Sequence, residues 1–359
     1  MVKILNSIIL IIVFIQVICA QSKSSFSNSN TLCYLNIPKR PANANEGSEF
    51  VAQVTGLSIT DRETAVVREI LSGNVPSFSR KLRSLKISQT VDAKKYELIY
   101  FSVCDYMAIG SDQDYLYISM TPTTAQYLAD KLNCSLPTKK IVDNIYANSE
   151  MKLSPQPIPP SDEMTTIQVF RQHTDSIKQQ ISQLGFDRSA NSIIAGHKKD
   201  IIISNNVYSP DRNYARVVIY GWHLSENNPI QPVYNGHIAT YADYSHGVRL
   251  ISKLAFINGD SIHVDDILKD SNFSMLLSSE GVISKPYYPE SKILTSVGNK
   301  IKNSQIDFEL SRNYPNSLNL IMLINYQLSE NTVVDLSTFN LVGEEVSTLV
   351  SEEQPAGNY

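Results

Sequence analysis

The stretch Tyr96-Glu-Leu-Ile-Tyr-Phe-Ser-Val103 is rich in aromatic and β-branched residues, a composition that is typical of a buried strand. A second run of the same kind, Tyr115-Leu-Tyr-Ile-Ser119, follows the polar loop Gly110-Ser-Asp-Gln-Asp114. These two predicted strands begin the part of the chain from which the fold class can be read, because the pattern changes to helical spacing directly after them.

Three helices are predicted next. Thr121-Pro122 supplies an N-cap with proline in the first turn, and Leu136-Pro137-Thr138 opens a second helix in the same way. A third helix is expected from about Thr165 to Leu184, where Gly185 can end it. Each has an apolar face at helical spacing; the faces are Ala125, Leu128, Ala129 and Leu132, then Ile141, Val142, Ile145 and Tyr146, then Phe170, Ile177, Ile181 and Leu184.

Strands return after the helices. They are predicted at Ile201-Ile-Ile203 and Val217-Val-Ile-Tyr220, and in a hairpin from Leu254 to Val264 that turns at Asn258-Gly259. Strands, helices and again strands predict an α+β core domain. We expect this domain to span residues 33–305, as one body or as two subdomains divided near the proline-rich residues 154–161.

The N-terminus has the layout of a secretory signal peptide at residues 1–20. Lys3 precedes the apolar run Ile8 to Ile15, and Ile18-Cys-Ala20 places a small residue before Gln21. The alternative is a membrane anchor, but the run is too short for a transmembrane helix. Residues 21–32 are rich in serine and asparagine and are expected to form a disordered leader.

The C-terminal residues predict short antiparallel strands. Apolar residues alternate with polar ones from Ile324 to Leu328, and Val334 and Leu336 repeat the alternation. Between them Ser329-Glu-Asn331 is predicted as a hairpin turn, and Gly343-Glu344 as a second turn. The pattern is typical of a small β-sandwich.

Four blocks in this region carry a resemblance to a known family: Phe308-Glu-Leu-Ser-Arg-Asn-Tyr-Pro-Asn316, Ile324-Asn-Tyr-Gln-Leu328, Leu341-Val-Gly-Glu-Glu-Val346 and Glu353-Gln-Pro-Ala-Gly-Asn-Tyr359. Their order resembles the C-terminal sorting domain that the type IX secretion system of Bacteroidota-like bacteria recognises. The resemblance implies an Ig-like β-sandwich at residues 307–359 and export to the cell surface or the medium, with the secretion machinery as a partner.

Two departures from this family pattern stand out. Ser317-Leu318 replace the usual second proline and phenylalanine, and the chain stops at Tyr359, where the family continues with further strands. We therefore expect an incomplete, truncated sorting module with an unpaired strand edge.

Composition narrows the function classes. The chain has 31 basic and 35 acidic side chains and no basic run, which argues against a nucleic-acid-binding role. No glycine-rich phosphate loop is present, which argues against an NTPase or a dinucleotide enzyme. Beyond the signal peptide three cysteines remain, Cys33, Cys104 and Cys134, which allow one disulfide in an oxidising compartment; Cys33 with Cys134 is one pairing.

Reactive residues concentrate between positions 196 and 249. Four of the six histidines lie there, in or near the segments Gly196-His-Lys-Lys-Asp200, Tyr220-Gly-Trp-His223, Gly236-His237 and Asp243-Tyr-Ser-His-Gly247. The single tryptophan, Trp222, belongs to the same region. Three interpretations compete.

In the first interpretation His223 and His237, together with either Asp243 or His246, bind a divalent metal such as zinc, which activates a water for hydrolysis. His237 and Asp243 lie six residues apart, so they can meet only if the chain turns between them. For an exported protein, an amidase or peptidase acting on cell-wall or protein substrates is the expectation that follows from location.

In the second interpretation Ser245 or Cys104 is a nucleophile. His246 is then the base, Asp243 or Asp200 orients it, and Lys199 beside Asp200 holds an anionic substrate. A buried, inert thiol is the commoner state of a residue placed like Cys104.

In the third interpretation the domain is not catalytic. The 19 tyrosines and Trp222 hold an extracellular polysaccharide or peptide by stacking, while His237 and His246 donate and accept hydrogen bonds.

Four further features favour structural roles. His173 falls on the apolar face of its helix and is predicted to lie in the core, whereas His263 is predicted at the surface. Lys198-Lys199 is expected to be a solvated strand entrance. Asp112 and Asp114 resemble the start of a calcium loop, but the distal ligand spacing is missing.

Overall fold

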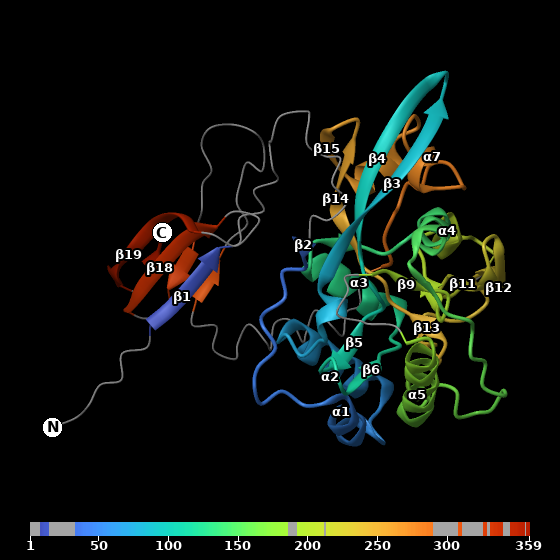
Figure 1. Cartoon of the computed structure of the whole chain (residues 1–359), viewed down its shortest axis with the longest axis horizontal. Coiled ribbons are helices and arrows are strands. Elements are labelled where there is room, and N and C mark those ends of the chain that lie inside the picture. The colour runs from blue at the N-terminus through green and yellow to red at the C-terminus, as the bar shows by residue number, and fades with distance from the viewer. Residues whose placement is uncertain are drawn as a thin grey trace. The chain divides into compact units, whose positions relative to one another are not determined.

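The computed structural model describes residues 8–13, 33–185, 192–211, 213–289, 308–310, 326–328, 331–339, 345–355 and 357–359. The chain divides into two units. One is the core, Ser29–Thr295, and the other joins Met1–Asn28 to Ser296–Tyr359. Helices and antiparallel sheets in the core confirm the predicted α+β class (Figure 1).

The largest sheet of the core is built around one long hairpin. Strands β3 (Lys81–Val91) and β4 (Lys94–Val103) pair antiparallel along their whole length, and they form the long ribbon of Figure 1. The strand predicted at 96–103 is the second strand of this hairpin, β4. The strand order is β15-β14-β4-β3-β2, with β7 also on β14; the bounds are β2 Cys33–Tyr34, β7 Cys134–Ser135, β14 Ile251–Ile257 and β15 Asp260–His263.

A second sheet carries most of the reactive residues. Its strand order is β12-β11-β10-β13, where β10 pairs antiparallel with β11 and parallel with β13. The bounds are β10 Lys199–Ile201, β11 Ile219–Ser225, β12 Asn228–Tyr234 and β13 His246–Gly247. The two remaining pairs of the core are β5 (Ala108–Gly110) with β6 (Tyr115–Tyr117), and β8 (Met151–Lys152) with β9 (Ile194–Ala195).

The three predicted helices are confirmed. They are α3 (Pro122–Lys131), α4 (Lys139–Asn148) and α5 (Ile167–Gln183). Thr121, Thr138 and Thr166 are their N-caps, and each threonine side chain accepts a hydrogen bond from the amide three residues on. The other helical elements are α1 Gly47–Val54, α2 Ile59–Leu71, α6 Val264–Lys269, α7 Ser274–Leu277 and the 3-10 turns Ser77–Ser79 and Asn205–Tyr208.

The predicted helix faces lie in the core with one exception. Ile141, Phe170 and Ile177 are buried completely, but Leu184 is 58% exposed. Leu184 was expected on the apolar stripe of the third helix, and that prediction is wrong because Leu184 is the C-cap residue, where the helix has already ended. Gly185 follows at φ +63°, as expected for a helix-ending glycine.

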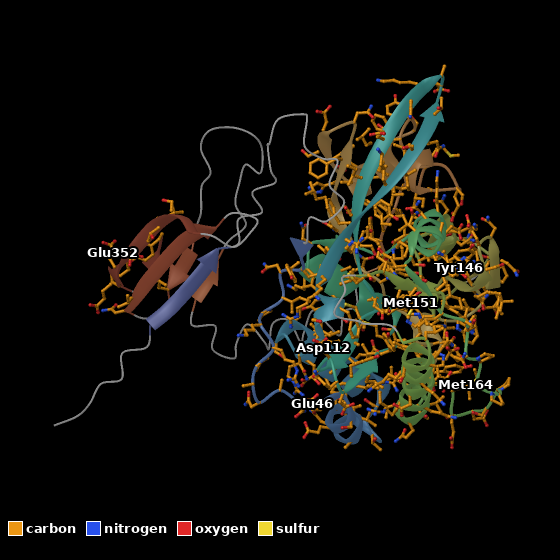
Figure 2. The ribbon with its side chains drawn as sticks, viewed as in Figure 1. Glu46, Asp112, Tyr146, Met151, Met164 and Glu352 are labelled. Atoms are coloured by element: carbon orange, nitrogen blue, oxygen red, sulfur yellow. The ribbon has the colours of Figure 1, made fainter. Side chains whose placement is uncertain are left out.

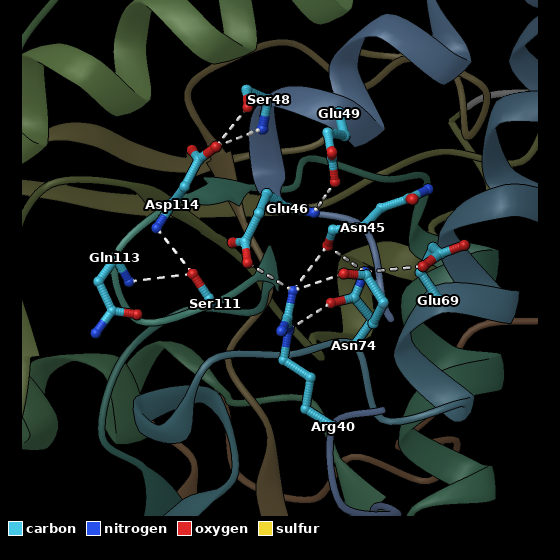
Figure 3. A network of polar contacts seen from close by, with 11 residues as sticks. Arg40, Asn45, Glu46, Ser48, Glu49, Glu69, Asn74, Ser111, Gln113 and Asp114 are labelled. Carbon is cyan, nitrogen blue, oxygen red and sulfur yellow. Dashed lines mark hydrogen bonds and ion pairs between the residues drawn. The ribbon is translucent and has the colours of Figure 1, made fainter. Parts of the chain in front are cut away.

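The loop that resembled a calcium-loop start serves as a helix clamp. Asp114 accepts hydrogen bonds from the amide and hydroxyl of Ser48 at the start of α1, and Asp112 does the same for Ser77. Nearby, Arg40 donates to Asn74 and Glu46 in the network of Figure 3. Both carboxylates therefore accept hydrogen bonds from backbone amides and serine hydroxyls of the protein itself.

Strand boundaries and one cysteine differ from expectation. The strand predicted at 201–203 is observed two residues earlier, as β10 (Lys199–Ile201). The residues that pair with β11 and β13 are Lys199, Asp200 and Ile201. The hairpin at Asn258-Gly259 is confirmed, with both residues at positive φ. Cys134 is a free, buried thiol, so the pairing of Cys33 with Cys134 is wrong; its sulfur instead lies 3.4 Å from the carbonyl oxygen of Leu132.

The terminal unit contains two small sheets. One orders β1 (Ile8–Val13), β18 (Thr332–Phe339) and β19 (Glu345–Gln354); the other orders β16 (Phe308–Leu310), β17 (Tyr326–Leu328) and β20 (Gly357–Asn358). Strands β17 and β18 belong to different sheets, so the described residues do not pair as the predicted hairpin; Ser329 and Glu330 of its predicted turn lie outside the described residues. The turn predicted at Gly343-Glu344 and the leader at 21–32 lie outside the described residues.

The apolar run assigned to the signal peptide contributes strand β1, which pairs in parallel with β18 from Ile8 opposite Val333 to Val13 opposite Thr338. Among the residues that the structure describes, no helix is long and apolar enough to cross a membrane.

Candidate functional site

Strand β10 organises the reactive residues. Lys199 lies opposite Gly221 of β11 and His246 of β13, while Asp200 lies opposite Tyr220 and Gly247. Successive side chains of a strand point to opposite faces of its sheet. Lys199 and Asp200 therefore organise two separate sets of polar groups, one on each face.

An irregular backbone in β11 decides which of its residues joins which set. Gly221 has φ +121° and Trp222 has φ +59°, a conformation that costs a non-glycine residue about 1–3 kcal/mol. A Cβ atom on Gly221 would lie 3.5 Å from Asp200 Oδ2, and the amine of Lys199 lies 4.7 Å from the ring centroid of Trp222. Trp222 consequently faces Lys199, and His223 faces the side of Asp200.

The Lys199 cluster consists of Lys199, His237, Tyr241, Asp243 and His246. His237 and Tyr241 stack with ring centroids 4.2 Å apart, and Tyr241 packs edge-on against His246 at 5.8 Å. The Tyr241 hydroxyl donates to Asp243 Oδ2 at 3.1 Å, and His246 Nε2 lies 3.9 Å from the same oxygen. Asp243 and His246 are buried, whereas Lys199, His237 and Tyr241 are partly exposed to solvent.

Asp243 is held firmly. Its Oδ1 accepts hydrogen bonds from the Ser245 amide at 2.8 Å and from the Ser245 hydroxyl at 2.6 Å. Ser245 therefore donates its proton to a carboxylate rather than to a histidine. Both ring nitrogens of His246 are buried and make no hydrogen bond to the residues that the structure describes. The geometry thus differs from the serine–histidine pair of a nucleophilic site.

The electrostatics of the cluster favour neutral bases. Burial lowers the pKa of His246 to about 4 and also lowers the pKa of His237, with Lys199 adding to both effects. Burial likewise lowers the pKa of the Lys199 amine, although Asp243 opposes it. Burial works to raise the pKa of Asp243, but His246, Ser245 and Lys199 together bring it below its ordinary value. At neutral pH both imidazoles are therefore uncharged beside an ionised carboxylate.

Lys198, next to this cluster along the chain, is buried, contrary to expectation. Lys198 was predicted to be solvated, but it is 1% exposed and donates to the carbonyl oxygen of Tyr244 at 2.6 Å. Burial lowers the pKa of Lys198 to about 7. The prediction was wrong because Lys198 precedes the strand and its stem runs into the core, where long side chains can bury their methylene groups.

Two further histidines belong to the interior. His173 is completely buried, which confirms the prediction, and packs edge-on against Tyr244 at 4.8 Å. His197 is also fully buried, with Nε2 3.2 Å from Asp105 Oδ1. The exposed position of His263 confirms its expected place at the surface.

On the opposite face of β10 lies a small pocket, here called the Asp200 pocket, whose free space is about the size of one water molecule. Asp200 Oδ2 accepts a hydrogen bond from the Tyr106 hydroxyl at 2.7 Å, and Arg249 lies over the Tyr106 ring at 4.2 Å. Burial raises the pKa of Asp200 to about 6. The lining residues are Tyr106, Val142, Ile145, Tyr146, Ala195, Gly196, Asp200, His223 and Arg249.

His223 belongs to this pocket. Its Nε2 lies 3.2 Å from Asp143 Oδ1, and its ring stacks on Tyr146 (labelled in Figure 2) at 4.5 Å. Of the four predicted metal ligands, the fold therefore groups His237 and His246 with Asp243, and places His223 with Asp200. Within the described part of the chain, no group of three or more His, Cys, Asp or Glu side chains is arranged to hold a metal ion.

Cys104 does not have the properties of an activated nucleophile. Its thiol is buried, and burial raises its pKa to about 11, so the reactive thiolate is scarce at neutral pH.

Sequence reasoning missed Asp105, Tyr106, Asp143, Tyr241 and Arg249. Tyr106 and Arg249 lie 143 positions apart along the chain and meet only in the folded structure. One local signal was present: Asp105 and Tyr106 directly follow a strand and the cysteine that had drawn attention to this segment.

Comparisons with protein-family models, with curated proteins and with solved structures each found no match.

Proposed function

We propose that the core domain is a hydrolase whose reaction centre is the Lys199 cluster. One observation carries this proposal. A partly exposed imidazole, His237, and a partly exposed amine, Lys199, lie beside the buried pair of Asp243 and His246. Groups of different acid–base type with shifted pKa values at an accessible place are characteristic of catalytic sites.

His237 is the general base in this proposal. Because its pKa lies below the ordinary value, its imidazole is neutral at pH 7 and can accept a proton from a water molecule. The oxygen of that water attacks the carbonyl carbon of an amide. The proton held by His237 then passes to the leaving nitrogen as the carbon–nitrogen bond breaks.

Lys199 stabilises the negative charge that develops on the carbonyl oxygen. A positioned cation at such an oxygen is a common way to lower an acyl-transfer barrier. The amine of Lys199 packs against the face of the Trp222 ring, and the negative charge of Asp243 favours the charged form of the amine. In this proposal the positive φ of Trp222 serves to place its ring against the Lys199 amine.

Asp243, Tyr241 and His246 are positioning residues. Tyr241 connects the buried carboxylate to the base, since its hydroxyl bonds Asp243 while its ring stacks on His237. His246 packs against Tyr241 from the other side. The orientation of His237 therefore depends on residues that lie deeper in the protein.

Amide bonds in extracellular peptides or in cell-wall material are the proposed substrate class. The support is the signal-peptide layout and the resemblance of residues 307–359 to a type IX sorting domain, with the secretion machinery as a transient partner.

A zinc-dependent version of the hydrolase is the second candidate. The observation in its favour is the pair of unpartnered ring nitrogens on buried His246, close to Asp243 and His237. These three residues would hold the ion only after their side chains reorient, because in the described part of the chain they are not arranged as a metal site. Zinc would supply a bound water of lowered pKa.

The test is a substrate screen with matched histidine variants. Purified full-length protein is incubated with peptidoglycan sacculi and with a peptide mixture, and newly released amines are quantified. We expect release by the wild type and by His263→Gln, and loss in His237→Gln. Metal content measured on the same samples separates the two versions. Binding to sacculi without any amine release would favour the binding module instead.

A further inference from the structure

The Asp200 pocket contains an acceptor without a donor. Asp200 is 1% exposed; its Oδ2 is bonded by Tyr106, whereas Oδ1 has no hydrogen-bond partner among the described residues. Arg249 does not serve it, because its Nε lies 3.9 Å from Oδ1 and its two terminal nitrogens donate to main-chain carbonyls of Val103 and Ile194. A buried carboxylate oxygen in this state is costly, and a ligand that donates to it recovers that cost.

The chemistry of the unserved atom favours a cationic donor. Arg249 lies near Asp200, and Lys139 and His223 lie beside Asp143. None of these groups donates a hydrogen bond to Asp200 Oδ1 among the described residues. Because this oxygen belongs to a carboxylate, it favours a donor, and a positively charged donor more than a neutral one.

The size and walls of the pocket restrict the cation further. The free space beside Asp200 admits a group about the size of one water molecule. Val142, Ile145 and Ala195 provide apolar walls, and the rings of Tyr146 and His223 complete them. An ammonium group has the required size and three donors, whereas a guanidinium or a quaternary ammonium is too large.

We propose that the Asp200 pocket is a binding site for the primary ammonium group of a ligand, which donates a hydrogen bond to Asp200 Oδ1. The site lies on the opposite face of β10 from the Lys199 cluster, so it stands independently of the proposed hydrolase activity. A free amino terminus or a lysine-like side chain is the chemical class that it would take.

The test measures thermal unfolding of the full-length protein at pH 7.5 in equal concentrations of methylammonium, tetramethylammonium and potassium chloride. A ligand that binds the folded state alone raises the unfolding temperature. We expect methylammonium to stabilise the wild type relative to both other salts. This comparison uses no variant, so it does not depend on whether a variant folds.

Two variants locate the effect. Asp200→Asn keeps the shape of the side chain and removes its charge, and we expect the affinity for methylammonium to fall at least about tenfold. Asp260→Asn, at the exposed first residue of β15, is the matched control and should bind like the wild type. Equal stabilisation by all three salts, or methylammonium binding that survives Asp200→Asn, would overturn the proposal and leave the pocket as a water site.

Discussion

The ring of Tyr241 lies stacked on the ring of His237, with centroids 4.2 Å apart and planes inclined by 19°. The Tyr241 hydroxyl at the same time donates to buried Asp243. One side chain thus links a partly exposed imidazole to a carboxylate that lies within the protein.

Tyr241→Phe removes the hydroxyl and keeps the stacked ring. We expect kcat to fall about tenfold, which corresponds to about 1.4 kcal/mol of barrier, because His237 loses its tie to Asp243. Tyr241→Leu should fall further, since it loses the stack as well. Steady-state kinetics check this order. Tyr208→Phe, at an exposed tyrosine outside the Lys199 cluster, should keep wild-type kinetics, and equal rates in all three variants would contradict the positioning role.

Lys199→Met tests the amine without removing the stem over Trp222. Lys199 lowers the pKa of His237 by charge repulsion, so its removal should raise that pKa. We expect a lower kcat, together with an acid limb of the pH–rate profile that moves to higher pH. A rate profile measured from pH 5 to 9 is the readout. A profile that keeps its midpoint would mean that Lys199 and His237 do not interact.

Stability should depend on pH through the buried imidazole of His246. Burial lowers its pKa from 6.5 to about 4, so the unfolded chain binds more protons than the folded protein in this range. Stability is therefore complete above pH 6.5 and is lost as the pH falls towards 4. Asp200, whose pKa is raised from 3.8 to about 6, acts in the opposite direction, since its contribution is lost as the pH rises through 6.

Urea unfolding at pH 7 and pH 5 measures the His246 contribution. We expect the difference in unfolding free energy between the two pH values to shrink by about 1–2 kcal/mol in His246→Asn. His263→Gln, at an exposed position, should leave that difference unchanged. Identical pH dependence in wild type and His246→Asn would show that this imidazole is not buried in its neutral form.

Gly196→Ala tests the close packing under the reactive segment. Gly196 has φ +102°, and a Cβ atom there would lie 2.3 Å from the carbonyl oxygen of Leu153. We expect a loss of stability of about 2 kcal/mol or more. Gly259→Ala is the control, because Gly259 also has a positive φ but nothing within 4 Å of an added Cβ atom. Similar losses of stability in both variants would mean that the positive φ alone causes the loss and that the predicted clash with Leu153 does not contribute.

Local signals in the sequence predicted the helices well and the sites only partly. Thr121, Thr138 and Thr166 act as caps because capping depends on a few neighbouring residues. The separation of His223 from His237 follows instead from positive φ angles at Gly221 and Trp222. No spacing rule contains that information, because a regular strand would alternate its side chains without such a change.

Burial was equally hard to read from the sequence. Lys198-Lys199 has the composition of a solvated segment, yet Lys198 is buried while its neighbour is partly exposed. The contrast arises from the tertiary partners of each amine: the Tyr244 carbonyl oxygen for Lys198 and the Trp222 ring for Lys199. Such partners lie tens of residues away along the chain.

The most direct test of the Lys199 cluster as a reaction centre is the ratio of kcat/KM between His237→Gln and His263→Gln on the best substrate from the screen. A general base contributes about 100-fold or more to the rate, so we predict that His237→Gln falls by at least that factor while His263→Gln matches the wild type. Unchanged kcat/KM in folded His237→Gln would contradict the account.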